Sequence, residues 1–69
     1  MSVADLMGTN LRLANLRNAD LWMADLKDTI LQGTELQGAN LADATNLTQK
    51  QVDSAITDDA TVLPSGFRR

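Results

Sequence analysis

The chain has 69 residues and a net charge of −3, so it has room for one small domain. It contains no cysteine and no histidine, which excludes disulfides, Cys/His zinc sites, cysteine nucleophiles and histidine bases. The acidic balance argues against a general nucleic-acid binder, whose surface is usually basic. The sequence begins without the basic and apolar segments of a signal peptide, and no window is long enough to cross a membrane. We therefore expect a cytoplasmic protein that binds neither nucleic acid nor membrane.

A leucine occurs at every fifth position over most of the chain. An α-helix turns by about 100° per residue, so leucines at this spacing would be scattered around its circumference. In a straight strand an odd spacing would place successive leucines on opposite faces. The pattern therefore requires a chain that bends once in five residues and stacks its turns into a solenoid. The leucines are Leu6, Leu11, Leu16, Leu21, Leu26, Leu31, Leu36 and Leu41.

A small residue lies two positions before each leucine, with a mostly polar residue between them. In an extended segment, residues two apart point to the same side. The small residue and the leucine therefore both face the interior and form the expected structural core, while the residue between them faces outward. The small residues are Ala4, Thr9, Ala14, Ala19, Ala24, Thr29, Thr34 and Ala39. The outward residues are Asp5, Asn10, Asn15, Asp20, Asp25, Ile30, Glu35 and Asn40.

The units ADLMG, TNLRL, ANLRN, ADLWM, ADLKD, TILQG, TELQG and ANLAD resemble pentapeptide repeats of the form A(D/N)LXX. The resemblance covers residues 4–43. It implies an all-β solenoid, the right-handed quadrilateral β-helix or Rfr-fold, with four repeats to a coil. A coil of about 20 residues would stack Leu6 on Leu26, and the repeats would make about two coils. The resemblance is specific for the fold and says little about function.

The repeat pattern stops at residue 44, and a different signal follows it. Thr48 and Gln51 have the spacing of a capping box in which Thr48 is the N-cap. We therefore predict a helix from about Gln49 to Ile56, followed by a loop and an extended tail.

The segment with this helix resembles the C-terminal cap of many pentapeptide-repeat proteins, especially cyanobacterial ones. A cap covers the apolar core and the unpaired edge that the end of a solenoid exposes. The expected division is a β-helix over residues 1–44 and a short α-helical cap with a tail over residues 45–69.

The N-terminal end carries no comparable cap signal, because only Met1, Ser2 and Val3 precede the first repeat. A stack of about two coils is short for a solenoid, which normally needs roughly three units. We therefore expect a protein partner at this end. The partner is either a second copy of the chain, which would give a homodimer, or the rest of a larger parent chain. Met1 and Val3 are candidate interface residues.

Trp22 is the third candidate interface residue. It follows Leu21 at a corner position that normally points outward in this repeat. An exposed tryptophan with apolar neighbours is typical of a protein interface. The alternative is that Trp22 packs within the molecule, against the cap or a neighbouring side chain.

No group of side chains indicates catalysis, because the expected interior is filled by leucine and alanine and no pair of carboxylates shares a pocket. We predict a non-catalytic structural or protein-interaction module without cofactor or metal. The alternative, implied by the resemblance, is a DNA mimic that inhibits a topoisomerase or another DNA-binding protein. Mimicry needs a regular array of negative charge. A 20-residue coil stacks only one outward acidic pair, Asp5 and Asp25.

Overall fold

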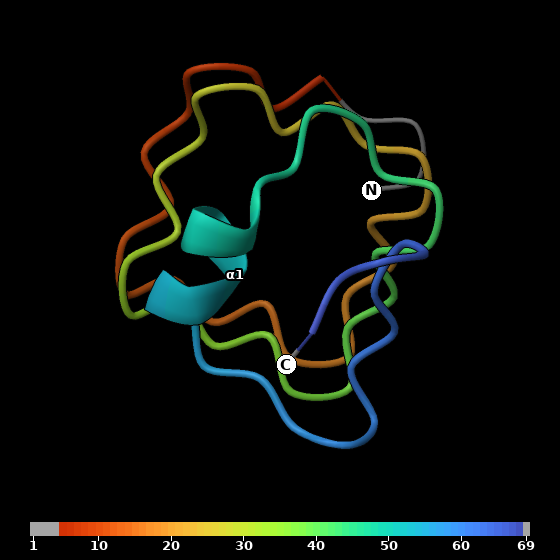
Figure 1. Cartoon of the computed structure of the whole chain (residues 1–69). Coiled ribbons are helices and arrows are strands. Elements are labelled where there is room, and N and C mark those ends of the chain that lie inside the picture. Colours follow the sequence, from red (N-terminus) through yellow and green to blue (C-terminus); the bar gives the residue numbers. More distant parts are fainter. Residues whose placement is uncertain (1–4, 69) are drawn as a thin grey trace.

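The computed structural model describes residues 5–68, in which the chain winds repeatedly around one axis (Figure 1). We call residues 5–24 the lower layer, residues 25–44 the middle layer and residues 45–68 the C-terminal segment. The lower and middle layers are joined by parallel β-bridges between Asp5 and Asp25, Asn10 and Ile30, Asn15 and Glu35, and Asp20 and Asn40. The C-terminal segment is joined to the middle layer by parallel bridges between Asp25 and Thr45, Glu35 and Ile56, and Asn40 and Val62. This stacking of successive turns is that of a β-helix solenoid.

The β-structure of the described residues consists of isolated bridges, with no continuous strand. The reason is the turn that closes every repeat. The Thr9 N–H donates to the Leu6 carbonyl at 3.0 Å, and the same bond between residues three apart recurs in all the repeats up to Ala44 and Leu41. Each turn therefore leaves only a short extended segment, and only the outward residue of that segment takes part in a bridge.

The third residue of each of these turns has a positive φ, which type II turns require. The positions are Gly8, Leu13, Asn18, Met23, Asp28, Gly33, Gly38 and Asp43. Glycine adopts this conformation without steric cost, whereas a bulky side chain is strained there. Leu13 and Met23, with φ of 61° and 60°, are the two bulky residues held in it.

The outward polar residues have a local role in these turns. Asn10 Oδ1 accepts a hydrogen bond from the Arg12 N–H at 3.1 Å, and Asp25 Oδ1 accepts one from the Lys27 N–H at 3.1 Å. The same bond is made by Asp5, Asn15, Asp20 and Asn40. A short side chain with a terminal oxygen is the kind that reaches the N–H two residues later. The preference for Asp and Asn at this position therefore comes from turn formation as well as from solvation.

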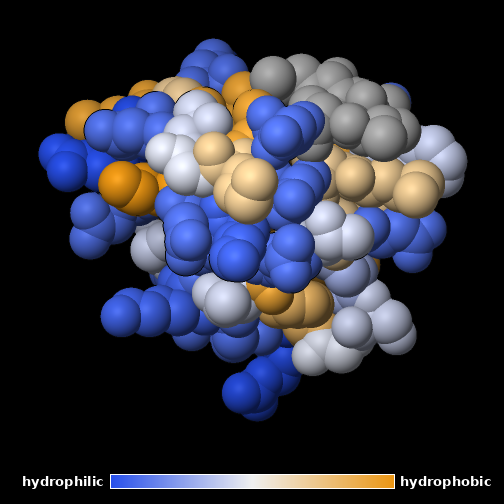
Figure 2. All heavy atoms as spheres, turned by 90° about the horizontal axis from the view of Figure 1, so that it is seen from above, coloured by the Kyte–Doolittle hydropathy of each residue, from blue (hydrophilic) through white to orange (hydrophobic). Residues whose placement is uncertain are grey.

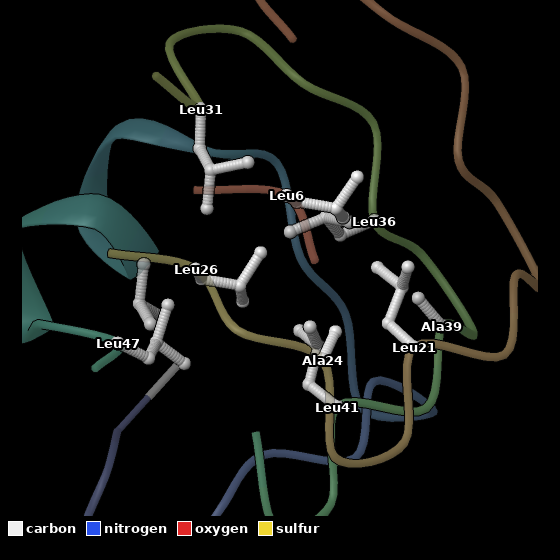
Figure 3. Packing of buried hydrophobic residues seen from close by; sticks show 10 residues of the cluster. Leu6, Leu21, Ala24, Leu26, Leu31, Leu36, Ala39, Leu41 and Leu47 are labelled. Carbon is white, nitrogen blue, oxygen red and sulfur yellow. The ribbon is translucent and has the colours of Figure 1, made fainter. Parts of the chain in front are cut away.

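The interior is a leucine and alanine core (Figure 3). It also contains a few buried threonine hydroxyl groups. The Thr29 and Thr34 hydroxyls donate to the carbonyls of Leu6 and Leu11 in the layer below, at 2.6 and 2.7 Å. The Thr61 hydroxyl makes the equivalent bond to the Leu36 carbonyl at 2.8 Å. Threonine is therefore tolerated at an interior position because its polar group has a partner there.

The expected core residues of both layers include buried members, but only the lower layer has partly buried ones. The buried ones are Leu6, Leu21, Ala24, Leu26, Thr29, Leu31, Thr34, Leu36, Ala39 and Leu41. The partly buried ones, all in the lower layer, are Thr9, Leu11, Ala14, Leu16 and Ala19. Ala4 lies outside the described residues.

The one helix of the described residues is α1, Gln49–Ser54. Thr48 is its N-cap: Thr48 Oγ1 accepts from the Gln51 N–H at 3.2 Å, and Gln51 Oε1 accepts from the Thr48 N–H at 2.8 Å. The predicted end at Ile56 is wrong by two residues, because the backbone of Ile56 is bonded to the middle layer. Its N–H donates to the Thr34 carbonyl at 2.8 Å.

In Figure 1, α1 lies within the outline of the winding chain. Val52 of α1 and Leu47, just before it, belong to the same buried cluster as the leucines of the repeats. Both side chains therefore contribute to the core. Within residues 5–68 there is no helix with the length and apolar character needed to cross a membrane.

Candidate functional site

The exposed end of the lower layer is the first candidate site. Leu31 and Leu36 in the middle layer are 3% and 1% exposed, whereas Leu11 and Leu16, directly below them, are only partly buried. The other two leucines of the lower layer, Leu6 and Leu21, are 7% and 1% exposed, so the leucine exposure at this end is confined to Leu11 and Leu16. An apolar surface is therefore accessible at this end among residues 5–68.

The backbone at the same end also has unused donors. The N–H groups of Ile30 and Glu35 donate to the carbonyls of Thr9 and Ala14, at 3.0 and 2.9 Å. The corresponding N–H groups of Asn10 and Asn15 have no partner within residues 5–68. Unpaired donors beside apolar side chains are characteristic of an edge that can pair with another chain.

Trp22 lies at a corner of the lower layer and is 41% exposed. Its backbone N–H donates to Asp20 Oδ1 at 3.2 Å, which holds the corner. The adjacent Met23 is 42% exposed. The structure thus places an exposed aromatic and an exposed thioether side by side along the chain. The other candidate interface residues, Met1 and Val3, lie outside the described residues.

The remaining exposed apolar side chains come from several faces of the solenoid. They are Met7, Leu13, Ile30, Ile56 and Val62. The side of the molecule in Figure 2 accordingly shows separate hydrophobic patches among hydrophilic side chains. Sequence reasoning did not single out Ile30. The available signal was that Ile30 is the only apolar residue at an outward position of the repeats.

A small notch lies next to Ile30, and we call it the Ile30 notch. It has a volume of about 210 Å³, and Ile30, Leu31, Lys50 and Ser54 are among the residues that line it. Three columns of bridged residues continue from the middle layer into the C-terminal segment, but the column of Asn10 and Ile30 does not. The reason is that α1 occupies the corresponding part of the chain and lies off the column.

Contacts from α1 replace part of the missing backbone pairing. Gln51 Nε2 donates to the carbonyls of Leu26 and Thr29, both at 2.8 Å. The Ser54 carbonyl accepts from the Gly33 N–H at 2.9 Å. The N–H of Leu31 has no partner within the described part of the chain.

The carboxylates of Asp25 and Asp58 accept hydrogen bonds from neighbouring segments of the chain. Hydrogen bonds from the Asn46 side chain and from the Lys27 N–H lower the pKa of Asp25. Partial desolvation raises the pKa of Asp58, but bonds from the Gly38 N–H and from Thr61 outweigh it, so the net pKa is lowered. Among residues 5–68 no three acidic, His or Cys side chains are grouped as metal ligands.

The outward columns do not form a regular array of negative charge. Asp5 is bridged to Asp25, but Asn10 is bridged to Ile30 and Asp20 to Asn40. The Asp25 carboxylate in addition accepts a hydrogen bond from Asn46 at 3.0 Å. Nothing in this arrangement favours DNA mimicry.

The comparison with known families agrees with the geometry. The sequence profile for pentapeptide repeats matches residues 2–33 and 9–49, with eight copies of the repeat. No curated protein matches the chain significantly. The matched residues include every five-residue turn described above and every β-bridge between residues 20 positions apart. The predicted family is therefore confirmed. The chain belongs to the pentapeptide repeat family.

Proposed function

We propose that this chain is a non-catalytic protein-interaction module that associates with a second copy of itself through the end of its lower layer. In this proposal residues 1–44 form a right-handed, four-sided β-helix of about two coils, and residues 45–69 cap its C-terminal end. Membership of the pentapeptide repeat family supports the non-catalytic, structural character.

The observation that carries the proposal is the difference between the two ends of the stack. Val52 and Leu47 lie buried against the core beside the middle layer. At the other end, Leu11 and Leu16 are partly exposed next to the N–H groups of Asn10 and Asn15, which have no partner within residues 5–68. Covering both the apolar surface and the backbone edge removes two sources of instability in one contact.

A two-fold axis perpendicular to the solenoid axis would bring two lower layers face to face. Such an interface is isologous, so each copy contributes the same residues. The chain would run in opposite directions on the two facing edges, which is the arrangement of antiparallel pairing. Trp22, at a corner of this layer, would add an aromatic side chain at the margin of the contact.

The mass of the protein in solution tests this proposal. We expect light scattering behind a sizing column to show twice the chain mass, with dissociation as the protein is diluted. A monomer at all concentrations, with the circular dichroism of the folded protein, would contradict self-association. A longer parent chain offers an independent check: if further residues precede the lower layer there, the same surface should be covered within one molecule.

A further inference from the structure

We propose that the Ile30 notch binds an extended, acidic peptide segment of a partner protein by adding it to the column of Asn10 and Ile30. The inference rests on the proposed function as an interaction module. It assigns a second surface, distinct from the lower-layer end, and the chemistry of the partner that fits it.

The backbone of the notch has the donor that such a segment needs. Each of the other seven repeat leucines follows an outward residue, and its N–H donates to the carbonyl of the residue bridged above that outward residue. The bond from Leu36 to the Ile56 carbonyl, at 2.8 Å, is one example. Only the N–H of Leu31 lacks this bond within residues 5–68. A peptide carbonyl placed above Ile30 would complete the series.

A second backbone contact is available beside the first. In the parallel bridges of this solenoid, the stacked residue also donates its N–H to the carbonyl preceding the bridged residue, as Ile30 does to Thr9 at 3.0 Å. For Ile30 that carbonyl belongs to Thr29, which already accepts from Gln51 Nε2 at 2.8 Å. A carbonyl oxygen has two lone pairs, so Thr29 retains the capacity for a peptide N–H. The geometry is that of strand addition to a sheet edge.

The side chains around the notch define the peptide. Ile30 is 42% exposed, and the residue bridged to it in the lower layer is the polar Asn10. An apolar, β-branched side chain beside it would cover this surface. Lys50 and Ser54 lie one helical turn apart on α1, and both line the notch. Lys50 is the only charged residue of the lining, so an acidic side chain next to the apolar one is the complementary choice.

Amide chemical shifts test the inference at the atom concerned. The ¹⁵N-labelled protein is titrated with the peptide Ac-Glu-Val-Thr-Val-Glu-NH₂ and, separately, with the same peptide carrying Lys in place of Glu. We expect the Leu31 amide to shift saturably with the acidic peptide and its hydrogen exchange to slow, while the Leu36 amide stays unchanged. The basic peptide should bind more weakly.

Two variants sharpen the result. Lys50→Glu should weaken the acidic peptide by about two- to fivefold at low salt, as expected for one exposed ion pair. Ile30→Asp should abolish binding without unfolding the protein, because Asp occupies the same outward position in three other repeats, at Asp5, Asp20 and Asp25. A Leu31 amide that does not respond at millimolar peptide would overturn the inference. So would binding that survives Ile30→Asp.

The outcomes separate this inference from the self-association proposed above. Neither variant lies in the lower layer, so the solution mass should be unchanged in both. If the Leu31 amide does not shift with peptide in a protein that still dimerises, the peptide site alone is contradicted. Saturable binding by a protein that is always monomeric supports the site and contradicts self-association alone.

Discussion

The side-chain amide of Gln51 donates to the Thr29 carbonyl at 2.8 Å and so links α1 to the end of the middle layer. The same amide bonds the Leu26 carbonyl, and its oxygen accepts from the Thr48 N–H. One side chain thus caps α1 and satisfies two carbonyls at the end of the stack. The residue that the sequence marks as part of the helix cap therefore also bonds the last carbonyls of the middle layer.

Gln51→Ala should therefore destabilise the fold more than loss of an ordinary helix cap. The side chain makes three hydrogen bonds with backbone groups, and a fourth, longer one of 3.3 Å with the Thr48 hydroxyl. All four disappear in the variant. Because each backbone bond is worth about 0.5–1.5 kcal/mol, we expect a loss of about 2–3 kcal/mol in the free energy of unfolding. Urea denaturation followed by circular dichroism measures it. Gln32→Ala is the matched control, since Gln32 is exposed and no side-chain hydrogen bond involves it within residues 5–68. Equal losses in both variants would contradict the role of Gln51.

Two glycines with the same backbone conformation should respond differently to alanine. Gly8 and Gly38 have φ of 71° and 73°, so each substitution carries the cost of a left-handed residue, about 1–2 kcal/mol. A Cβ at Gly38 would also collide with Asn18 Oδ1, whereas a Cβ at Gly8 has no neighbour within 4 Å. We expect thermal unfolding to show the larger loss for Gly38→Ala. Adding Asn18→Gly should recover the excess, and a failure to recover it would exclude the collision as its cause.

Trp22→Ala should weaken self-association while the solenoid remains folded. The side chain is 41% exposed, so little core packing is lost, and aromatic residues at interfaces often contribute about 2 kcal/mol or more. We expect the dimer dissociation constant from sedimentation equilibrium to rise by about tenfold or more. Val62→Ala, at an exposed residue of the C-terminal segment, should leave the constant unchanged. Unfolding of Trp22→Ala by circular dichroism would instead make Trp22 part of the core.

The fold should lose stability in acid as two carboxylates are protonated. The pKa values of Asp25 and Asp58 are lowered from an ordinary value of 3.8, so both groups favour the folded state above that pH. This contribution is lost as the pH falls from about 4 through the lower folded pKa values. The urea midpoint measured between pH 6 and pH 2 should show the fall. Asp58→Asn should make the midpoint less dependent on pH in this range, and an unchanged dependence would argue against the role of Asp58.

The five-residue bend and the inward direction of the leucines follow from the sequence alone, because both depend on spacing within one repeat. The pairing of Thr48 with Gln51 is local in the same sense, since the two residues are three positions apart. The family and the solenoid class were predictable for this reason. The same local view placed the end of α1 at Ile56, two residues too far.

Only the tertiary structure decided how these local units cover one another. Leu16 and Leu36 occupy the same repeat position, yet only Leu36 is buried. Leu36 lies between the lower layer and the C-terminal segment, whereas Leu16 lies at the end of the described stack. Ile56 leaves the helix because the Thr34 carbonyl accepts its N–H at 2.8 Å. The Leu31 N–H, which has no partner in the described part of the chain, likewise reflects the displacement of α1 from its column. Burial and backbone pairing in a stack depend on the neighbouring layer, and spacing within one repeat does not determine what that layer contributes.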